Sequence, residues 1–511
     1  MTSLFDAGPF APCPAPFNLA AYVLAHARDM GEKPALEILH PDHVERWSYG
    51  ALESAVRGIA TGLLARGLKS GDKILMRLGN TVDFPLSYLG AITAGMVPVP
   101  TSAQLTAREV SKMVSSLAPA AILYSDGIAL PENSGCHQIG QAELKQMHAL
   151  PPADFDMGDP ERLAYIVYTS GTSGQPRAVC HAHRAIWARR MMHEGWYGLR
   201  ASDRLLHAGG FNWTFTLGTG LMDPWSLGAT ALIPAEGTDP ATLPDLLREH
   251  KASIFAAAPG VYRKMLNHPD FPDLPDLRHG LAAGEKLSAP LRAAWHSATG
   301  GQIYEAYGMS ECSTFISSSP SAPAHDGAIG RPQTGRRVAL IDAETGDIVP
   351  RGSAGTIAVH RSDMGLMLGY FGAEDETAAK YAGDWFMTGD QGVMDENSEI
   401  SYLGRLDDMM NAGGFRVSPL EVEAALLPHP QIHEVGVIDI EVKQGASVIM
   451  AFYTSDEELD EEALGAFAAT RLARYKQPRA YIRLPHLPLN PNGKLSRRAL
   501  KSEHEARLRG A

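Results

Sequence analysis

Small hydroxyl residues and glycines follow an apolar run in residues 163–177, which read LAYIVYTSGTSGQPR. The run ends at Tyr168, and the loop after it contains Thr169, Ser170, Gly171, Thr172, Ser173 and Gly174. Such a loop lets backbone N–H groups and hydroxyls approach a phosphate, and Arg177 adds a positive charge nearby. A flexible turn between a strand and a helix would have the same composition. The P-loop pattern, GxxxxGK followed by Ser or Thr, is absent, which disfavours a P-loop nucleotide hydrolase.

The loop resembles the signature loop of the adenylate-forming superfamily, which includes acyl-CoA synthetases, luciferases and peptide-synthetase adenylation domains. That superfamily usually ends the loop with Lys-Gly, whereas Arg177 and Ala178 stand here. Arginine keeps the positive charge but not the compact geometry of an ammonium group. The resemblance implies that the loop from Thr169 to Gly174 binds ATP and AMP, and that Arg177 takes part in catalysis.

Five further segments match motifs of the superfamily in its order and spacing. The first two are Gly284-Glu285-Lys286, which by resemblance lies against adenine, and Tyr307-Gly308-Met309-Ser310-Glu311. In the second motif, the resemblance implies that Tyr307 stacks near adenine and that Ser310, in place of the usual threonine, touches phosphate. Glu311 would hold Mg²⁺, a hard cation that prefers carboxylate and phosphate oxygens.

The other three motifs come later in the chain. Thr388-Gly389-Asp390 implies a carboxylate that accepts hydrogen bonds from the ribose hydroxyls, and Arg405 would contact ribose or phosphate. Asp407 would be the hinge between a large and a small domain. The tunnel for coenzyme A would be lined by Gly413, Gly414, Phe415 and Arg416. Lys494, in Asn490-Pro491-Asn492-Gly493-Lys494, would reach the reacting carboxylate and the α-phosphate. Each short motif alone is usually an ordinary turn, but six in register favour the superfamily.

The resemblance predicts an ATP-dependent ligase that joins a carboxylic acid to AMP and then transfers the acyl group to a thiol. The approach of an anion to a polyanion makes the barrier largely electrostatic, so Mg²⁺, Arg177 and Lys494 would supply the opposing charge. No nucleophilic side chain is needed. The histidines that follow the loop have no metal-ligand spacing, and we expect solvated or core positions for them: His181, His183, His193 and His207.

Two segments indicate the class of carboxylic acid. They are Gly209-Gly210-Phe211-Asn212-Trp213 and residues 221–229, which resemble medium-chain acyl-CoA synthetases and aryl-CoA ligases. By that resemblance Trp213 borders the acyl pocket; the alternative is a core tryptophan. Coenzyme A is the favoured thiol, and a basic stretch could meet its phosphates or be a solvated face: Arg471, Arg474, Lys476, Arg479 and Arg483. Two other functions stay open, a carrier-protein-loading adenylation enzyme and an inactive nucleotide-binding regulator.

Alternating patterns indicate the elements that hold these residues. We predict helices over residues 49–68, 84–94, 106–117, 261–266, 289–298, 419–427 and 461–473. We predict strands over residues 73–78, 96–99, 120–124, 253–257, 302–306, 338–341, 355–360, 434–439 and 447–453. The fold class is α/β: a large N-terminal domain (1–404) of stacked α/β subdomains with a distorted antiparallel region after about residue 325, a hinge (405–408), and a small mobile α+β domain (409–511).

Composition excludes several classes of protein. The 511 residues carry a net charge of −13, which argues against a nucleic-acid-binding surface over the whole molecule. The most apolar segment, residues 85–100, is too short to span a bilayer, and the N-terminus lacks a secretory signal. Four cysteines lie far apart without a CxxC pair, which suits neither zinc nor a disulfide framework. We expect a cytoplasmic protein and leave open a homodimer.

Overall fold

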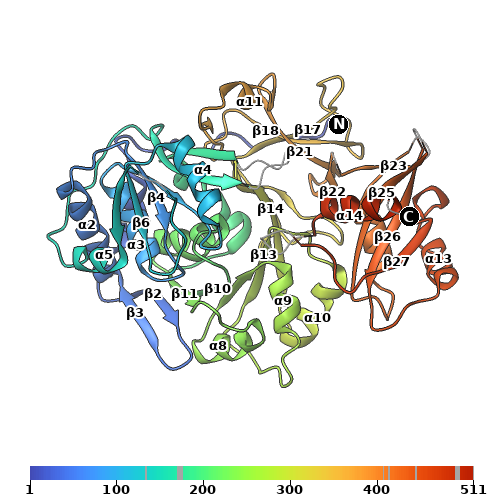
Figure 1. Ribbon diagram of the computed structural model, residues 1–511, viewed down its shortest axis with the longest axis horizontal. Coiled ribbons are helices and arrows are strands. Elements are labelled where there is room, and N and C mark those ends of the chain that lie inside the picture. Colours follow the sequence, from blue (N-terminus) through green and yellow to red (C-terminus); the bar gives the residue numbers. More distant parts are fainter. Residues whose placement is uncertain are drawn as a thin grey trace.

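The structure, a computed structural model, describes residues 1–132, 135–169, 177–406, 408–412, 415–443, 446–489 and 495–509 (Figure 1). A parallel four-stranded sheet lies among the blue and cyan elements of Figure 1, in the order β5-β4-β6-β7. Its strands are β4 (Lys73–Arg77), β5 (Val97–Pro100), β6 (Ala121–Tyr124) and β7 (His137–Gly140). Helices accompany this sheet: α1 (Leu19–Val23), α2 (Tyr49–Ala65), α3 (Asp83–Thr93), α4 (Ala107–Leu117) and α5 (Gln141–Met147).

A nine-stranded sheet in the order β16-β15-β14-β13-β12-β10-β11-β2-β3 forms the next layer. Its strands are β2 (Pro34–Leu39), β3 (Val44–Ser48), β10 (Arg204–His207), β11 (Thr230–Pro234), β12 (Ile254–Ala257), β13 (His279–Ala283), β14 (Ile303–Met309), β15 (Ser313–Ser317) and β16 (Arg331–Pro332). The run from β14 to β2 is parallel, so helices must cross over between successive strands. The crossovers use α7 (Asp223–Leu227), α8 (Leu243–Glu249), α9 (Pro259–Met265) and α10 (Ala289–Thr299).

The observed helices agree with the predicted ones in their buried faces and in the residues at their ends. On α2 the buried side chains include Leu52, Val56, Ile59 and Leu63, which recur at helical spacing. The helix ends at Ala65, three residues before the predicted end, and Gly67 adopts a φ of +80° there. Helix α4 begins after Thr106, whose side chain and that of Glu109 form a capping box.

Antiparallel strands dominate the chain after about residue 325, which confirms the predicted change of pattern. Strands β1, β17, β18, β21 and β20 pair in that order, and β22 adds to β21. Their bounds are β1 (Leu4–Asp6), β17 (Arg337–Ile341), β18 (Ala354–His360), β20 (Tyr381–Ala382), β21 (Trp385–Met394) and β22 (Ile400–Arg405). A separate three-stranded sheet, β19-β9-β8, is also antiparallel: β8 (Leu163–Thr169), β9 (Arg177–Ala182) and β19 (Gly369–Tyr370), with α11 (Glu374–Ala378) following.

The C-terminal part forms the red region of Figure 1 and has the predicted α+β composition. Its strands are β23 (Met410–Ala412), β24 (Phe415–Val417), β25 (Glu434–Lys443), β26 (Ala446–Thr454) and β27 (Ala480–Arg483). Its helices are α12 (Pro419–Leu426), α13 (Glu461–Ala469) and α14 (Arg497–Arg509). Helix α13 ends four residues before the predicted end. The domain limits at residues 404 and 409 stay a prediction.

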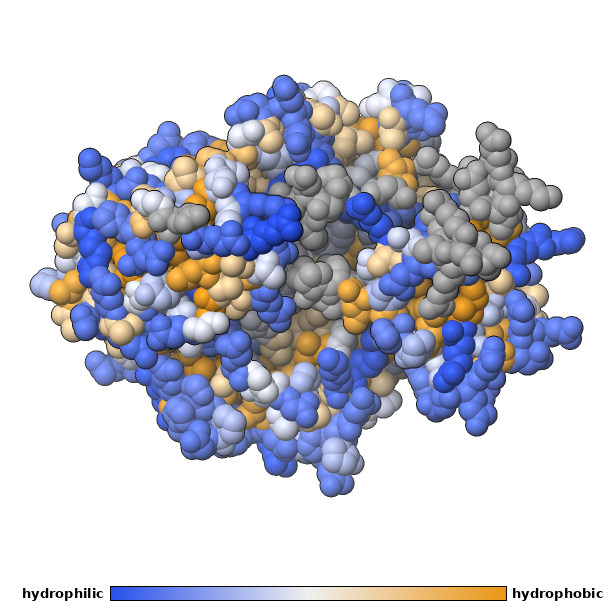
Figure 2. Space-filling model, viewed as in Figure 1, coloured by the Kyte–Doolittle hydropathy of each residue, from blue (hydrophilic) through white to orange (hydrophobic). Residues whose placement is uncertain are grey.

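Separate apolar cores support the two parts of the chain. The largest cluster joins α1, α2, α3 and the parallel sheet, while a smaller one, including Val422, Val437 and Leu464, lies within the C-terminal part. Figure 2 shows a mainly hydrophilic outline with hydrophobic residues in patches between charged ones. Among the described residues, no helix is both long enough and apolar enough to cross a bilayer.

Candidate active site

The predicted phosphate loop connects two antiparallel strands. Thr169, the last residue of β8, pairs with Arg177, the first residue of β9. The loop residues Ser170, Gly171, Thr172, Ser173 and Gly174 lie outside the described residues. The alternative of a turn between a strand and a helix is therefore wrong, because a strand follows the loop.

Arg177 points toward a tyrosine and an acidic helix. Its guanidinium lies 5.1 Å from the ring centroid of Tyr370, and its Nη2 lies 2.8 Å from Oε2 of Glu376 on α11. The Glu376 side chain is 52% exposed, so this ion pair is screened and worth only about 0–1 kcal/mol. A phosphate could therefore replace Glu376 as the partner of Arg177 at small cost.

Tyr370 also contacts Glu311. The Tyr370 hydroxyl donates to Oε1 of Glu311 over 2.7 Å, and the Glu311 residue is buried. Burial, followed by the charge of Glu311, raises the pKa of Tyr370, so the hydroxyl stays protonated and donates. The structure thus brings the predicted metal ligand and the predicted catalytic arginine to one aromatic ring. Tyr370 was not predicted, because a lone tyrosine in a two-residue strand carries no sequence signal.

A second cluster surrounds Asp390. The hydroxyl of Tyr307 donates to its Oδ2 over 2.6 Å, and the hydroxyl of Tyr402 donates to its Oδ1 over 3.0 Å. Nη1 of Arg405 lies 3.9 Å from Oδ1, since Asp390 and Arg405 are register partners on β21 and β22. The structure therefore brings the predicted residues Tyr307, Asp390 and Arg405 together. Tyr402 is a further member that sequence reasoning missed.

The remaining residues of the Tyr307 motif run along β14 and into its turn. A side chain at Gly308 would collide with the backbone of Ser313 and Thr314 on β15, which explains the glycine. Met309 ends the strand. The carbonyl of Ser310 contacts Nε2 of His181 over 2.7 Å. The motif is thus a tight connection between antiparallel strands that turns Glu311 toward Tyr370.

The predicted adenine segment lies one strand away from Tyr307. Register pairs Ala283, at the end of β13, with Ala306 on β14, so Gly284 leaves the sheet beside Tyr307. Gly284 has a φ of +94° and is exposed, as is Lys286, while Glu285 is partly buried. These residues consequently follow the carboxyl end of β13 and leave the sheet beside Tyr307.

Trp213 borders a cavity of about 400 Å³. The cavity is lined by residues that follow the carboxyl ends of β4, β5, β10 and β11, the edge where open α/β sheets bind ligands. The Trp213 ring meets Phe215 edge-on at 5.1 Å and is only partly buried. Trp213 therefore borders the cavity and also packs against the core cluster that contains Phe215, and its place in an acyl pocket stays a prediction. The chain on either side of Trp213 forms a short helix, α6 (Ala185–Ala188), and two π-helical turns, η2 (His193–Tyr197) and η3 (Thr216–Met222).

The histidines after the loop are mostly core residues. His181, His183 and His207 are buried. Burial lowers the pKa of His181 to about 4 and that of His207 to about 3, so both rings are neutral near pH 7. His193 is partly buried, and burial lowers its pKa to about 4. The core positions agree with the expectation from sequence.

Several predicted residues lie outside the described part of the chain. They are Asp407, Gly413, Gly414 and Lys494, together with the loop from Ser170 to Gly174. Phe415 and Arg416 belong to β24, where they pair with Ala412 and Asn411 of β23. Their place in a coenzyme A tunnel stays a prediction.

Comparison with known families identifies the class of protein to which this fold and site belong. The chain belongs to the AMP-binding enzyme family: the family description "AMP-binding enzyme" matches residues 23–371, and "AMP-binding enzyme C-terminal domain" matches residues 421–494.

Characterised relatives align over nearly the whole chain. A benzoate–CoA ligase of Thauera aromatica is 29% identical over 490 residues, covering 90% of this chain and 92% of the relative. The human mitochondrial acyl-coenzyme A synthetase ACSM2A is 28% identical over 530 residues, covering 96% and 91%. The solved benzoate CoA ligase of Burkholderia xenovorans LB400 superposes with a TM-score of 0.85 at 28% identity, covering 95% of this chain and 100% of that one.

Proposed function

We propose that this chain is an ATP-dependent carboxylate–CoA ligase that acts on a medium-chain or aromatic acid. The observation that carries the proposal is the near-complete alignment with benzoate–CoA ligase and medium-chain acyl-CoA synthetases. The reaction proceeds in two steps, with an acyl-adenylate formed first and an acyl-CoA thioester second. The release of AMP and pyrophosphate is part of this proposal.

The phosphate end of the site would be formed by Arg177, Glu311 and Tyr370. Arg177 would bind phosphate oxygens after it leaves the exposed Glu376, which lies 2.8 Å away. The Glu311 carboxylate fits Mg²⁺, because it is a buried oxygen donor held in place through one oxygen by Tyr370. Bound there, Mg²⁺ would neutralise charge on the triphosphate. The contribution of the protein is to orient these charges before the carboxylate arrives.

The nucleoside end would be formed by the cluster around Asp390. The hydroxyls of Tyr307 and Tyr402 donate to the two oxygens of Asp390. An ionised carboxylate only accepts and offers about four lone-pair positions, so Asp390 would also accept the ribose hydroxyls. Tyr307 would place its ring beside adenine while its hydroxyl holds Asp390, since burial and the Asp390 charge raise the pKa of Tyr307. Gly284, Glu285 and Lys286 would form the neighbouring edge of the adenine site.

Acid-dependent exchange of pyrophosphate into ATP tests the first step. We expect activity with at least one member of a panel of straight-chain acids of medium length and simple aromatic acids. A panel that also contains short and long acids provides the control for substrate choice. Inactivity with every acid would favour an inactive nucleotide-binding regulator and would contradict the proposed function.

Replacement of Trp213 by alanine should change the ranking of acids more than the KM for ATP. The partly buried Trp213 borders the cavity, whereas Trp225 is buried and donates its Nε1–H to the carbonyl of Ala35 over 2.8 Å. Trp225→Phe is therefore the matched core control and should lower the Tm without reordering the acids. Acid profiles and melting curves on both variants check this. An unchanged ranking in Trp213→Ala would show that Trp213 is not part of the acyl pocket.

Free coenzyme A is the favoured acceptor, because the relatives are named as CoA ligases. The basic stretch of the C-terminal part supports binding of the coenzyme A phosphates only in part. Lys476 pairs with Glu421 at 2.5 Å and Arg483 donates to the carbonyl of Ser455, so both are already engaged by the protein. Thioester formation with free coenzyme A, compared with a phosphopantetheine-bearing carrier protein, separates the two acceptors. A homodimer and a cytoplasmic location stay predictions.

A further inference from the structure

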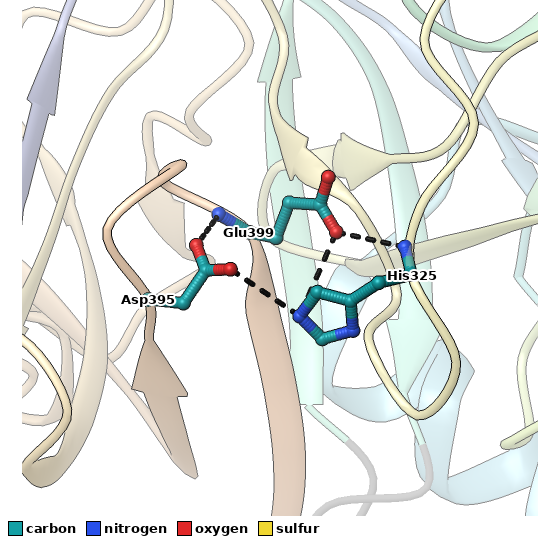
Figure 3. Close-up of side chains that lie close together, drawn as sticks. All are labelled: His325, Asp395 and Glu399. Carbon is teal, nitrogen blue, oxygen red and sulfur yellow. Dashed lines mark hydrogen bonds and ion pairs between the residues drawn. The ribbon is translucent and has the colours of Figure 1, made fainter.

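Three metal-ligating side chains meet away from the nucleotide site. His325 lies on the segment between β15 and β16, while Asp395 and Glu399 lie in the turn between β21 and β22 (Figure 3). The Nε2 atom of His325 is 3.3 Å from Oδ2 of Asp395 and 3.7 Å from Oε2 of Glu399. One ligand atom from each residue lies within 4.8 Å of the other two. No residue of the proposed ligase mechanism belongs to this cluster.

Each of the three side chains is oriented through its other polar atom. Nδ1 of His325 lies 3.0 Å from the carbonyl oxygen of Asp326. Oδ1 of Asp395 accepts the backbone N–H groups of Asn397 and Glu399 at 2.9 and 2.7 Å. Oε1 of Glu399 accepts Nη2 of Arg331 at 3.0 Å. Protein metal sites use such outer contacts to aim their ligands.

The contact of His325 with Asp326 determines which ring nitrogen carries hydrogen. A carbonyl oxygen can only accept, so Nδ1 is the donor, and Nε2 either carries a second proton or presents a lone pair to a metal ion. Nε2 faces two carboxylates, which only accept. Oε2 of Glu399 accepts the backbone N–H of His325 over 2.9 Å, and apart from a proton on Nε2 itself these contacts place no donor between the three ligand atoms. The two carboxylates therefore place a surplus of negative charge around Nε2, which either a proton on Nε2 or a metal ion bound between the three ligand atoms balances.

We propose that His325, Asp395 and Glu399 bind a divalent transition-metal ion, with Zn²⁺ as the best match. Zinc bonds of about 2.0–2.1 Å at tetrahedral angles separate ligand atoms by about 3.3 Å, close to the two separations from Nε2. Imidazole nitrogen combined with carboxylate oxygen suits Zn²⁺ better than Ca²⁺ or Mg²⁺, which prefer oxygen alone. Water would complete the coordination, because the side chains of His325 and Asp395 are 49% and 32% exposed.

The ion would cross-link the segment between β15 and β16 to the hairpin formed by β21 and β22. Ile329 donates to the carbonyl of Ile400 over 2.9 Å, and Ile400 donates to the carbonyl of Gly330 over 2.7 Å, so the segments already meet beside the cluster. Arg351 holds the far side of the turn through the carbonyl of Asp395 at 2.5 Å. The charge balance permits a dication, since Arg331 offsets only one of the two carboxylates. The role is structural and does not depend on the proposed ligase activity.

Zinc titration of the full-length, tag-free chain without nucleotide tests the proposal. We expect one saturable Zn²⁺ per chain by calorimetry, with a Kd raised in both His325→Gln and Asp395→Asn by at least the roughly 10- to 100-fold that loss of an outer-shell partner costs. His296→Gln is the matched control: His296 is exposed and its ring contacts the carbonyl of Gly301 at 3.2 Å, but it belongs to no metal-ligating group among the described residues. It should bind zinc as the unmodified chain does.

Hydrogen exchange provides the second measurement. Zinc should slow exchange of the amides of Ile329 and Ile400 in the unmodified chain and in His296→Gln, but not in the other two variants. Melting curves without zinc verify that each variant is folded. Equal zinc affinity in all four proteins, or binding without protection of these amides, would overturn the proposal. So would the absence of saturable binding, which would leave a protonated His325 as the cation.

Discussion

Lys494→Ala should lower the rate of acyl-adenylate formation about 10²- to 10³-fold, the usual effect of removing one preorganised charge from a transition state. The expectation rests on the resemblance of residues 488–494 to the superfamily's final motif, in which the lysine meets both the carboxylate and the α-phosphate. Acid-dependent pyrophosphate exchange measures this step. The same variant should still form thioester from preformed acyl-adenylate and coenzyme A, because its first step has been bypassed.

Gly414→Leu is the complementary variant. The resemblance places Gly414 in the tunnel for the pantetheine arm, where a missing side chain leaves room. This variant should block thioester formation and leave pyrophosphate exchange nearly intact. A folding defect would instead lower both activities in both variants. Parallel loss of the two half-reactions would argue against a mechanism in which the C-terminal part adopts two orientations about Asp407.

Asp390→Ala should raise the KM for ATP about 10- to 100-fold, because each hydrogen bond to a charged group is worth about 1.5–3 kcal/mol. The structure adds an expectation about stability. Removal of the carboxylate leaves the hydroxyls of Tyr307 and Tyr402 without their acceptor, which costs about 1–3 kcal/mol for a buried group. The Tm should therefore fall together with ATP affinity, and steady-state kinetics with melting curves measures both.

Tyr402→Phe separates these two effects. It removes the donor to Oδ1 and leaves the carboxylate in place for ribose, with Tyr307 still bound at 2.6 Å. We expect a smaller change in the KM for ATP than in Asp390→Ala. If Tyr402→Phe weakens ATP use as much as Asp390→Ala, then Asp390 acts by holding tyrosines and not by binding ribose.

The regular elements were predictable from sequence because periodicity reports burial directly. The expected strand at 73–78 is β4 (Lys73–Arg77), and the expected helix at 84–94 is α3 (Asp83–Thr93). Helix ends were less predictable. Helix α2 stops at Ala65, and Arg66 leaves helical geometry before Gly67. Helix α13 stops at Ala469, although residues 471–473 are of types that favour helices.

The partners of the site residues could not be predicted in the same way. Tyr370 reaches Glu311 across 59 positions, and Tyr307 reaches Asp390 across 83. Such contacts depend on how separate sheets pack, and no local pattern marks them. Motifs identified the residues that would touch a ligand, whereas Tyr370 and Tyr402, which orient those residues, carry no motif of their own.

The hairpin that holds the phosphate loop has an electrostatic consequence. A P-loop delivers phosphate to the start of a helix, whose aligned peptide dipoles act as about half a positive charge. Here β9 follows the loop, so that fixed source of attraction is missing and the side chain of Arg177 opens the next element instead. Beside the donors of the loop itself, the proposed triphosphate site would then rely on Mg²⁺ and on charged side chains such as Arg177, and salt weakens attraction to exposed charges. Nucleotide affinity should accordingly fall more steeply with ionic strength than in a P-loop protein.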